Sequence, residues 1–296
     1  MPGREPERAG FVEVNRTHLR VWEWGDPSSP VVLHIHGGFD HGRMFDELAP
    51  RVAALGYRAV AVDTRGHGDS GRLTSGATWL TQVLDLALLV SDLGAPVGII
   101  GHSMGGGQAL AVAGAFPELV RWVVNIDGLG PPEHAMVDPD DPGGAMSENL
   151  ERALRIVRRP PREWASLDAM ADQRAAINVR LPREWLLHLA EHGSHALPSG
   201  GRAWKSDPVF TVDLPSPFGY QQLLAQHRTV RCPVLVITGD QPDTWTEVNG
   251  AELDKRVANV PDARHVLVPG TGHYVHIEKP DAAMRAIAGF VDEVGP

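Results

Sequence analysis

The 296-residue sequence predicts an α/β fold with a mostly parallel central sheet flanked by helices. Two observations predict it. Short apolar runs, of the kind found in strands that are buried on both faces, alternate with segments whose apolar spacing suits helices. Gly or Pro follows the helical segments and marks their ends. This alternation is typical of a parallel sheet with crossover helices.

The elements follow in chain order, beginning with a β-hairpin over residues 11–24 that turns at Asn15-Arg16. Buried strands are then expected at 31–37, 57–63, 96–102 and 120–127. The helices between them are expected at 44–56, 77–94 and 105–117. After residue 230 the pattern resumes, with strands at 232–240 and 264–270 and helices at 244–258 and from about 280.

The strand signal disappears between about residues 129 and 229, where helical spacing dominates. Helices are expected there at 147–157, 163–179 and 182–193. Because strand-helix units flank this stretch on both sides, we expect one α/β core formed by 1–128 and 230–296, with an inserted, mainly helical cap at 129–229. The cap aromatics either pack the cap or line a substrate site, and they are Trp164, Trp185, Trp204, Phe210, Phe218 and Tyr220.

Composition excludes several classes of partner. The formal net charge is −10 at pH 7 with both signs interspersed, so nucleic acid is not expected to bind. The N-terminus lacks the apolar core of a secretory signal and no apolar run reaches about 18 residues, so a cytoplasmic protein with no membrane partner is expected. Cys232, the only cysteine, follows the pattern of a buried, inert thiol. The oligomeric state is not encoded in these patterns.

The pentad Gly101-His102-Ser103-Met104-Gly105 has the form G-x-S-x-G, which suits a sharp turn from a strand into a helix. Such a turn exposes the serine hydroxyl. A serine hydroxyl is a weak nucleophile at neutral pH, and it needs a base, an acid that orients the base, and donors for the developing oxyanion. Ser103 is therefore the candidate nucleophile.

The partners of Ser103 are expected at the carboxyl ends of neighbouring strands. His273 lies in a glycine-rich loop after the last strand and is the candidate base. Three aspartates follow core strands, and the chain order permits each as the acid: Asp243, Asp127 and Asp240. The backbone N–H groups of Met104 and of Gly38, or alternatively Phe39, are the candidate oxyanion donors.

Five motifs occur in order along the chain: "HGG" (36–38), "DTRGHGDS" (63–70), "GHSMGG" (101–106), "CPVLVITGD" (232–240) and "GTGHYVHIEKP" (270–280). With these motifs the chain resembles the α/β-hydrolase fold family, in particular its esterase-like members with a serine nucleophile and a helical cap. The resemblance implies Ser103 as nucleophile, His273 as base and an acid after the strand that ends near Thr238.

That implication ranks Asp243 first among the three acids, although Pro242 occupies the usual place of the acid and Asp243 comes one residue later. Asp127 is second, because some relatives draw their acid from the preceding strand, and Asp240 is third.

The implied activity is hydrolysis of an ester, lactone or thioester through an acyl-enzyme intermediate, without a metal or other cofactor. Haloalkane dehalogenases and epoxide hydrolases resemble the chain in "DTRGHGDS", but they carry an aspartate where Ser103 stands. Carbon-carbon bond hydrolysis, and a small-molecule receptor that keeps the triad without turnover, are the alternatives. The substrate is expected to be a small, uncharged and moderately apolar molecule.

Two other motifs favour structural roles. "HIHGGFDH" offers His34, His36, Asp40 and His41 as metal ligands, but their spacing differs from that of the H-x-H-x-D-H hydrolases, and hydrogen-bonded core positions are favoured. "DTRGHGDS" reads as a strand end and turn. Its charged side chains are expected to tie loops together, and they are Asp63, Arg65 and Asp69.

Overall fold

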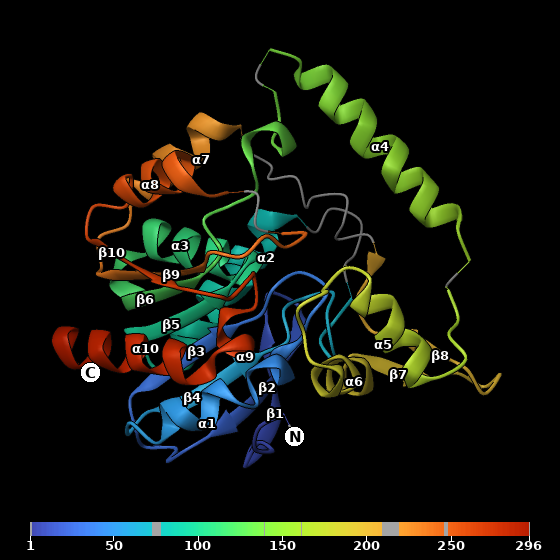
Figure 1. Cartoon of the computed structure of the whole chain (residues 1–296), viewed down its shortest axis with the longest axis horizontal. Coiled ribbons are helices and arrows are strands. Elements are labelled where there is room, and N and C mark those ends of the chain that lie inside the picture. The colour runs from blue at the N-terminus through green and yellow to red at the C-terminus, as the bar shows by residue number, and fades with distance from the viewer. Residues whose placement is uncertain are drawn as a thin grey trace.

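The computed structural model describes residues 2–72, 78–138, 140–160, 162–208, 219–245 and 248–295. An eight-stranded sheet forms its centre, in the order β1-β2-β4-β3-β5-β6-β9-β10 (Figure 1). The first two strands, β1 (Arg8–Val14) and β2 (Thr17–Trp24), are antiparallel, and the remaining strands run parallel to one another. The predicted fold class is confirmed.

The β1-β2 hairpin turns at Asn15 and Arg16, whose φ angles are 42° and 60°. Positive φ at both central residues is what a tight two-residue hairpin needs. The parallel strands match the predicted ranges, except that the last begins one residue earlier than predicted. They are β3 (Val31–Ile35), β4 (Arg58–Val62), β5 (Val97–His102), β6 (Val120–Ile126), β9 (Val234–Gly239) and β10 (Ala263–Val268).

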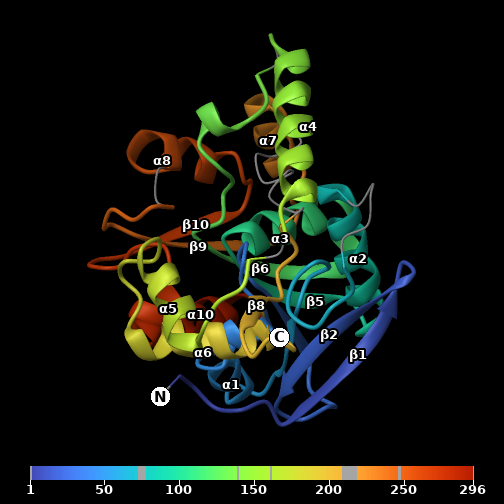
Figure 2. The same ribbon diagram turned by 90° about the vertical axis from the view of Figure 1, so that its right-hand side faces the viewer.

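Helices cover both faces of the sheet (Figures 1 and 2). One face carries α2 (Trp79–Asp92), α3 (Met104–Ala115) and α8 (Gly250–Ala258). The other carries α1 (Leu48–Ala53) and α10 (Pro280–Val294), with the short α9 (Val275–Glu278). Three short 3-10 helices join these elements: η1 (Gly42–Phe45), η2 (Pro117–Leu119) and η3 (Glu133–Ala135).

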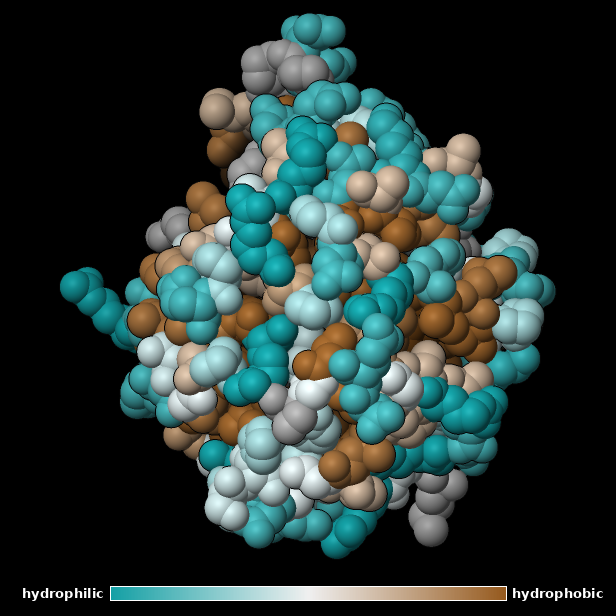
Figure 3. Space-filling view, turned by 90° about the vertical axis from the view of Figure 1, so that its left-hand side faces the viewer, coloured by the Kyte–Doolittle hydropathy of each residue, from teal (hydrophilic) through white to brown (hydrophobic). Residues whose placement is uncertain are grey.

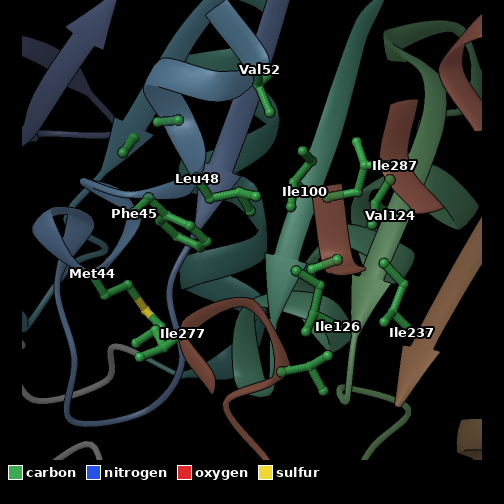
Figure 4. Packing of buried hydrophobic residues seen from close by; sticks show 14 of the residues in the cluster. Met44, Phe45, Leu48, Val52, Ile100, Val124, Ile126, Ile237, Ile277 and Ile287 are labelled. Carbon is green, nitrogen blue, oxygen red and sulfur yellow. The ribbon is translucent and has the colours of Figure 1, made fainter. Parts of the chain in front are cut away.

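Each face of the sheet has its own apolar core. Figure 4 shows the core beneath α1 and α10, where Leu48 and Val52 of α1 face Ile100 of β5. Ile287 of α10 packs in the same cluster. Because the central strands are buried on both faces, the sheet is rigid. It therefore fixes the points at which the loops leave its carboxyl edge.

Between β6 and β9 the chain forms α4 (Pro142–Arg158), α5 (Leu167–Ala175), α6 (Arg183–His192) and α7 (Tyr220–His227). Figures 1 and 2 show α4 projecting from the molecule, and α7 beside α8. A two-stranded antiparallel sheet, β7 (Ser194–Ala196) and β8 (Arg202–Trp204), lies near α6. The expectation that this region holds no strand is wrong, because strands of three residues are too short to show a period.

The aromatic residues that were expected in a cap differ in their surroundings. Trp185 is buried within the apolar core that α1 and α10 share. Tyr220 is buried in a separate small cluster with Met136 and Leu223. Both therefore pack the fold. Trp164 and Trp204 are partly exposed, whereas Phe210 and Phe218 lie outside the described residues.

The face shown in Figure 3 mixes hydrophilic residues with smaller hydrophobic areas. Among the helices of the described ranges, none is both long and apolar enough to cross a membrane. Cys232 is buried, and burial raises the pKa of its thiol to about 11, so it stays protonated and unreactive at neutral pH.

Gly98 in β5 provides a test of core packing. A Cβ atom added there would lie 2.2 Å from the ring of the buried Trp122. We expect Gly98→Ala to lower the free energy of unfolding by about 1–3 kcal/mol, because the ring must move. The control is Gly289→Ala in α10, where an added Cβ meets nothing within 4 Å, and a gain of about 0.5–1 kcal/mol is expected. Urea unfolding measures both, and equal effects would contradict this account.

His276 provides a test of pH dependence. It is buried against Phe45, with ring centroids 5.5 Å apart, and burial lowers its pKa to about 3. Between pH 6.5 and 3 the unfolded chain therefore binds more protons at this site than the folded chain does, so stability falls as the pH falls. His276→Leu should remove a slope of up to about 1.4 kcal/mol per pH unit from unfolding free energy measured across this window. An unchanged slope in His276→Leu would contradict the prediction. The control substitution is His18→Leu, because His18 is exposed.

Candidate active site

The strand-to-helix turn at Ser103 is present as predicted. β5 ends at His102 and α3 begins at Met104, which leaves Ser103 at the corner with φ 53° and ψ −119°. Its N–H donates to the Ile126 carbonyl of β6 at 2.9 Å. A Cβ atom on Gly101 would lie 2.3 Å from the Gly105 carbonyl oxygen, so this corner requires glycine there. The serine is thus presented at the carboxyl edge of the sheet.

His273 and Asp127 meet at the same edge. Asp127 follows β6 directly, and His273 lies in the loop between β10 and α9. Nδ1 of His273 is 2.6 Å from Oδ2 of Asp127, and the two side chains are only 7% and 14% exposed. Because a carboxylate only accepts hydrogen bonds, Nδ1 carries the proton and Nε2 is left for another partner. This pairing corrects the expectation that Asp243 would be the carboxylate on His273.

The other two aspartates lie elsewhere in the loop after β9. Oδ2 of Asp243 lies beside Gly272, 2.9 Å from where a Cβ of that glycine would be. Asp240 accepts a hydrogen bond from the Gly270 N–H at 2.6 Å, which ties the β9 loop to the β10 loop. In the sheet β9 lies between β6 and β10, so strand order alone does not decide which aspartate meets His273, and the contact is made by Asp127. Sheet order is not visible in the periodicity of the sequence.

His102 connects Ser103 to the histidine loop, and sequence reasoning gave it no role. It is fully buried, its Nε2 donates to the His273 carbonyl at 3.1 Å, and the two ring centroids are 4.6 Å apart. Burial, together with His273 and His276, holds the pKa of His102 far below its usual value, so the ring is neutral. His102 occupies the unspecified position before the serine in G-x-S-x-G, so the motif gave no signal for this contact.

The turn Gly37–Asp40 follows β3 and lies against Ser103. The Asp40 N–H donates to the Gly37 carbonyl at 3.3 Å, so Gly38 and Phe39 occupy the corner. A Cβ atom on Gly37 would lie 3.2 Å from Cβ of Ser103. Met104 is the first residue of α3, where backbone N–H groups have no acceptor within the helix. The two predicted sources of oxyanion donors thus lie on either side of Ser103.

Backbone strain marks this edge of the sheet. Among the described non-glycine residues, positive φ occurs at the hairpin pair Asn15-Arg16 and at Phe39, Ser103 and Asp127. A left-handed conformation costs an L-residue about 1–2 kcal/mol. Such strain persists where the surroundings hold it, and it concentrates at functional sites. The three strained residues outside the hairpin follow β3, β5 and β6, which are neighbours in the sheet.

Each alternative metal ligand of "HIHGGFDH" makes at least one hydrogen bond, although Nε2 of His34 and Nδ1 of His41 have no partner among the described residues. Nδ1 of His34 contacts the Val32 carbonyl at 3.1 Å. Nε2 of His36 accepts from the Thr64 N–H at 3.0 Å. Asp40 accepts from Arg174 at 2.6 Å. His41 contacts the Leu189 carbonyl at 3.2 Å. These contacts give the residues the structural roles that the sequence favoured.

A different group brings metal-ligating atoms together, with Asp46, His188 and His192 all within 4.8 Å of one another. Arg43 already pairs with Asp46 at 2.6 Å. Desolvation and the Arg43 charge lower the pKa of His192 to about 4, so the ring is neutral. A cation here would be repelled by the guanidinium or would have to displace it. The group therefore serves as a buried Arg43–Asp46 ion pair, which His188 of α6 contacts at 3.2 Å.

The charged residues of "DTRGHGDS" also tie loops together. Asp63 accepts hydrogen bonds from the Gly42 and Asp69 N–H groups at 2.6 and 2.9 Å, and burial raises its pKa. Arg65 and Asp85 form a buried pair at 2.6 Å. Asp69 pairs with Lys205 at 2.7 Å, which links the core to the region between β6 and β9.

Comparison with known proteins agrees with this architecture. The chain is 28% identical over 283 residues to 2-(acetamidomethylene)succinate hydrolase of Mesorhizobium japonicum, which covers 95% of the chain and 94% of that protein. It is 28% identical over 275 residues to an esterase of Escherichia coli, covering 90% and 94%.

Among solved structures, a hypothetical protein of Pseudomonas aeruginosa superimposes with a TM-score of 0.85 at 27% identity, over 96% of this chain and 99% of that one. The sequence model of the alpha/beta hydrolase family matches residues 32–286. The match runs from within the first parallel strand to within the last helix. Together with the sheet and the corner at Ser103, it shows that the chain belongs to the alpha/beta hydrolase family.

Proposed function

We propose that this hydrolase cleaves a carboxylic ester or a related acyl bond, such as a lactone or thioester, with Ser103 as nucleophile, His273 as base and Asp127 as acid. The observation that carries the proposal is the 2.6 Å contact between His273 and Asp127, at the sheet edge where Ser103 is presented. Relatives that are named esterases support the acyl substrate.

In the proposed mechanism, Oγ of Ser103 attacks the acyl carbon as Nε2 of His273 takes its proton. Asp127 keeps the proton on Nδ1 and stabilises the imidazolium that forms. The N–H groups of Met104 and Gly38 donate to the oxyanion. As the tetrahedral intermediate collapses, His273 returns the proton to the leaving group and an acyl-Ser103 ester remains. Water, deprotonated by His273, then attacks this ester and releases the acid.

We further propose that residues 129–229 act as the cap over this site and that the substrate is small, uncharged and moderately apolar. Two exposed aromatic side chains border the site and support this substrate class. Phe39 is 39% exposed at the corner of the oxyanion turn, and Trp245 is 42% exposed with its ring centroid 6.4 Å from that of His273. Aromatic surface of this kind favours an apolar acyl or alcohol group.

The acid is tested by isosteric amide substitutions. Asp127→Asn should lower kcat for p-nitrophenyl ester hydrolysis by about 10⁴-fold, because the imidazolium loses its counter-charge and the tautomer of His273 is no longer fixed. Asp243→Asn and Asp240→Asn are the matched controls and should keep kcat within a few-fold of the unsubstituted enzyme. Thermal midpoints verify folding. A large loss in Asp243→Asn with Asp127→Asn unaffected would return the acid to the β9 loop.

The nucleophile is tested with a fluorophosphonate probe, which an activated serine attacks at phosphorus. Labelling should disappear in Ser103→Ala and fall strongly in His273→Ala. It should persist in the control Ser28→Ala, because this exposed serine precedes β3 and the site lies beyond the other end of that strand. Equal labelling of Ser103→Ala and the unsubstituted protein would remove the proposed nucleophile. Tight ligand binding with negligible ester turnover would identify a receptor, and turnover confined to carbon-carbon bonds would identify the other hydrolase class.

A further inference from the structure

A buried ion pair joins α5 to the turn Gly37–Asp40. Arg174 lies in the last turn of α5, and its Nη2 is 2.6 Å from Oδ1 of Asp40, with the two side chains 8% and 0% exposed. Nη1 of the same guanidinium donates to the Phe39 carbonyl at 3.2 Å. One side chain from the proposed cap thus holds both the backbone and a carboxylate of this turn.

Tyr274 extends this contact to the loop of His273. Its hydroxyl donates to Oδ2 of Asp40 at 3.1 Å and accepts from Nη2 of Arg174 at 3.3 Å. Burial and the charge of Asp40 raise the pKa of Tyr274, so the phenol remains a neutral donor. Tyr274 follows His273 directly, and their ring centroids are 5.4 Å apart. Asp40 therefore receives hydrogen bonds from two parts of the chain that meet at the site.

The turn needs such support because of its conformation. Phe39 has φ 65°, which a residue with a Cβ adopts only against steric resistance. Arg174 holds the carbonyl of the Phe39–Asp40 peptide and also the side-chain carboxylate of Asp40, which follows that peptide. Released from Arg174, the turn is free to relax toward negative φ. Because Gly38 directly precedes Phe39, this relaxation would shift the Gly38 N–H relative to Ser103.

We propose that Arg174 is a positioning residue that holds Phe39 in its left-handed conformation and thereby fixes the oxyanion donor of Gly38. The oxyanion hole is then complete only while α5 is seated on the core, with Asp40 and Tyr274 linking the same contact to the histidine loop. This inference rests on the proposed acyl hydrolysis at Ser103 and assigns that reaction a dependence on the cap.

The test is Arg174→Lys, which keeps the charge opposite Asp40 but loses the forked donor that also reaches the Phe39 carbonyl. We expect kcat for a p-nitrophenyl ester to fall about 10- to 100-fold with KM within about 2-fold, because the oxyanion contact strengthens in the transition state. Affinity for a trifluoromethyl ketone, which forms a tetrahedral adduct, should fall in parallel. The control, Lys205→Met, removes a different ion pair between this region and the core and should leave both values unchanged.

A rescue experiment separates positioning from a general structural role. Glycine adopts positive φ without steric cost, so Phe39→Gly removes the strain that Arg174 is proposed to hold. In the Phe39→Gly background, Arg174→Lys should lower kcat by less than about 3-fold. Equal losses in the two backgrounds would show that Arg174 acts only on folding, and an unchanged kcat for Arg174→Lys alone would also overturn the inference.

Two further measurements keep the outcomes distinct. If Arg174→Lys does not fold, the double substitution Asp40→Asn with Arg174→Gln removes both buried charges together and should give the same loss of kcat at retained KM. Ser103→Ala tests the proposed function separately. Full turnover in Ser103→Ala would overturn both proposals, whereas loss of turnover there combined with a silent Arg174→Lys would overturn only the positioning role.

Discussion

The candidate site depends on one backbone constraint, which is that the chain leaves three neighbouring strands through left-handed residues. Phe39 follows β3, Ser103 follows β5 and Asp127 follows β6, and each has a positive φ without being glycine. This conformation turns the chain sharply at the end of its strand, so the side chain or amide comes to the sheet edge. The buried sheet holds these corners, because the strands cannot shift without disturbing two apolar cores at once.

Around these corners, the buried groups near the proposed nucleophile are either neutral or paired with an opposite charge. His102 and His276 are buried and uncharged, because desolvation lowers their pKa values. Asp40 and Arg174 are buried and charged, but they compensate each other. In the proposed mechanism, a proton that passes between Ser103 and His273 therefore has neutral rings in His102 and His276 and a compensated ion pair in Asp40 and Arg174 nearby. Asp127 is the carboxylate that contacts the imidazole directly.

The sequence predicted the sheet well, because buried parallel strands leave continuous apolar runs and Gly or Pro marks the ends of their helices. It also predicted the corner at Ser103, since G-x-S-x-G is a local pattern with a local geometric cause. The partner of His273 depended on how the loops after β6, β9 and β10 fold against one another, and periodicity does not encode that arrangement. The contacts of Arg174 were not predictable for the same reason, because its partners Phe39 and Tyr274 are 135 and 100 residues away in the chain.

The pairing of His273 with a carboxylate on β6 has a consequence for how this scaffold can diversify. The loop after β9 carries Trp245 at the border of the site, and its Asp240 binds the Gly270 N–H rather than the imidazole. If Asp127 is the acid as proposed, changes at Trp245 alter the aromatic border of the site and leave the His273–Asp127 contact in place. Trp245 and the His273–Asp127 pair come from separate segments of the chain, so the shape of the site and its proposed chemistry can change independently of each other.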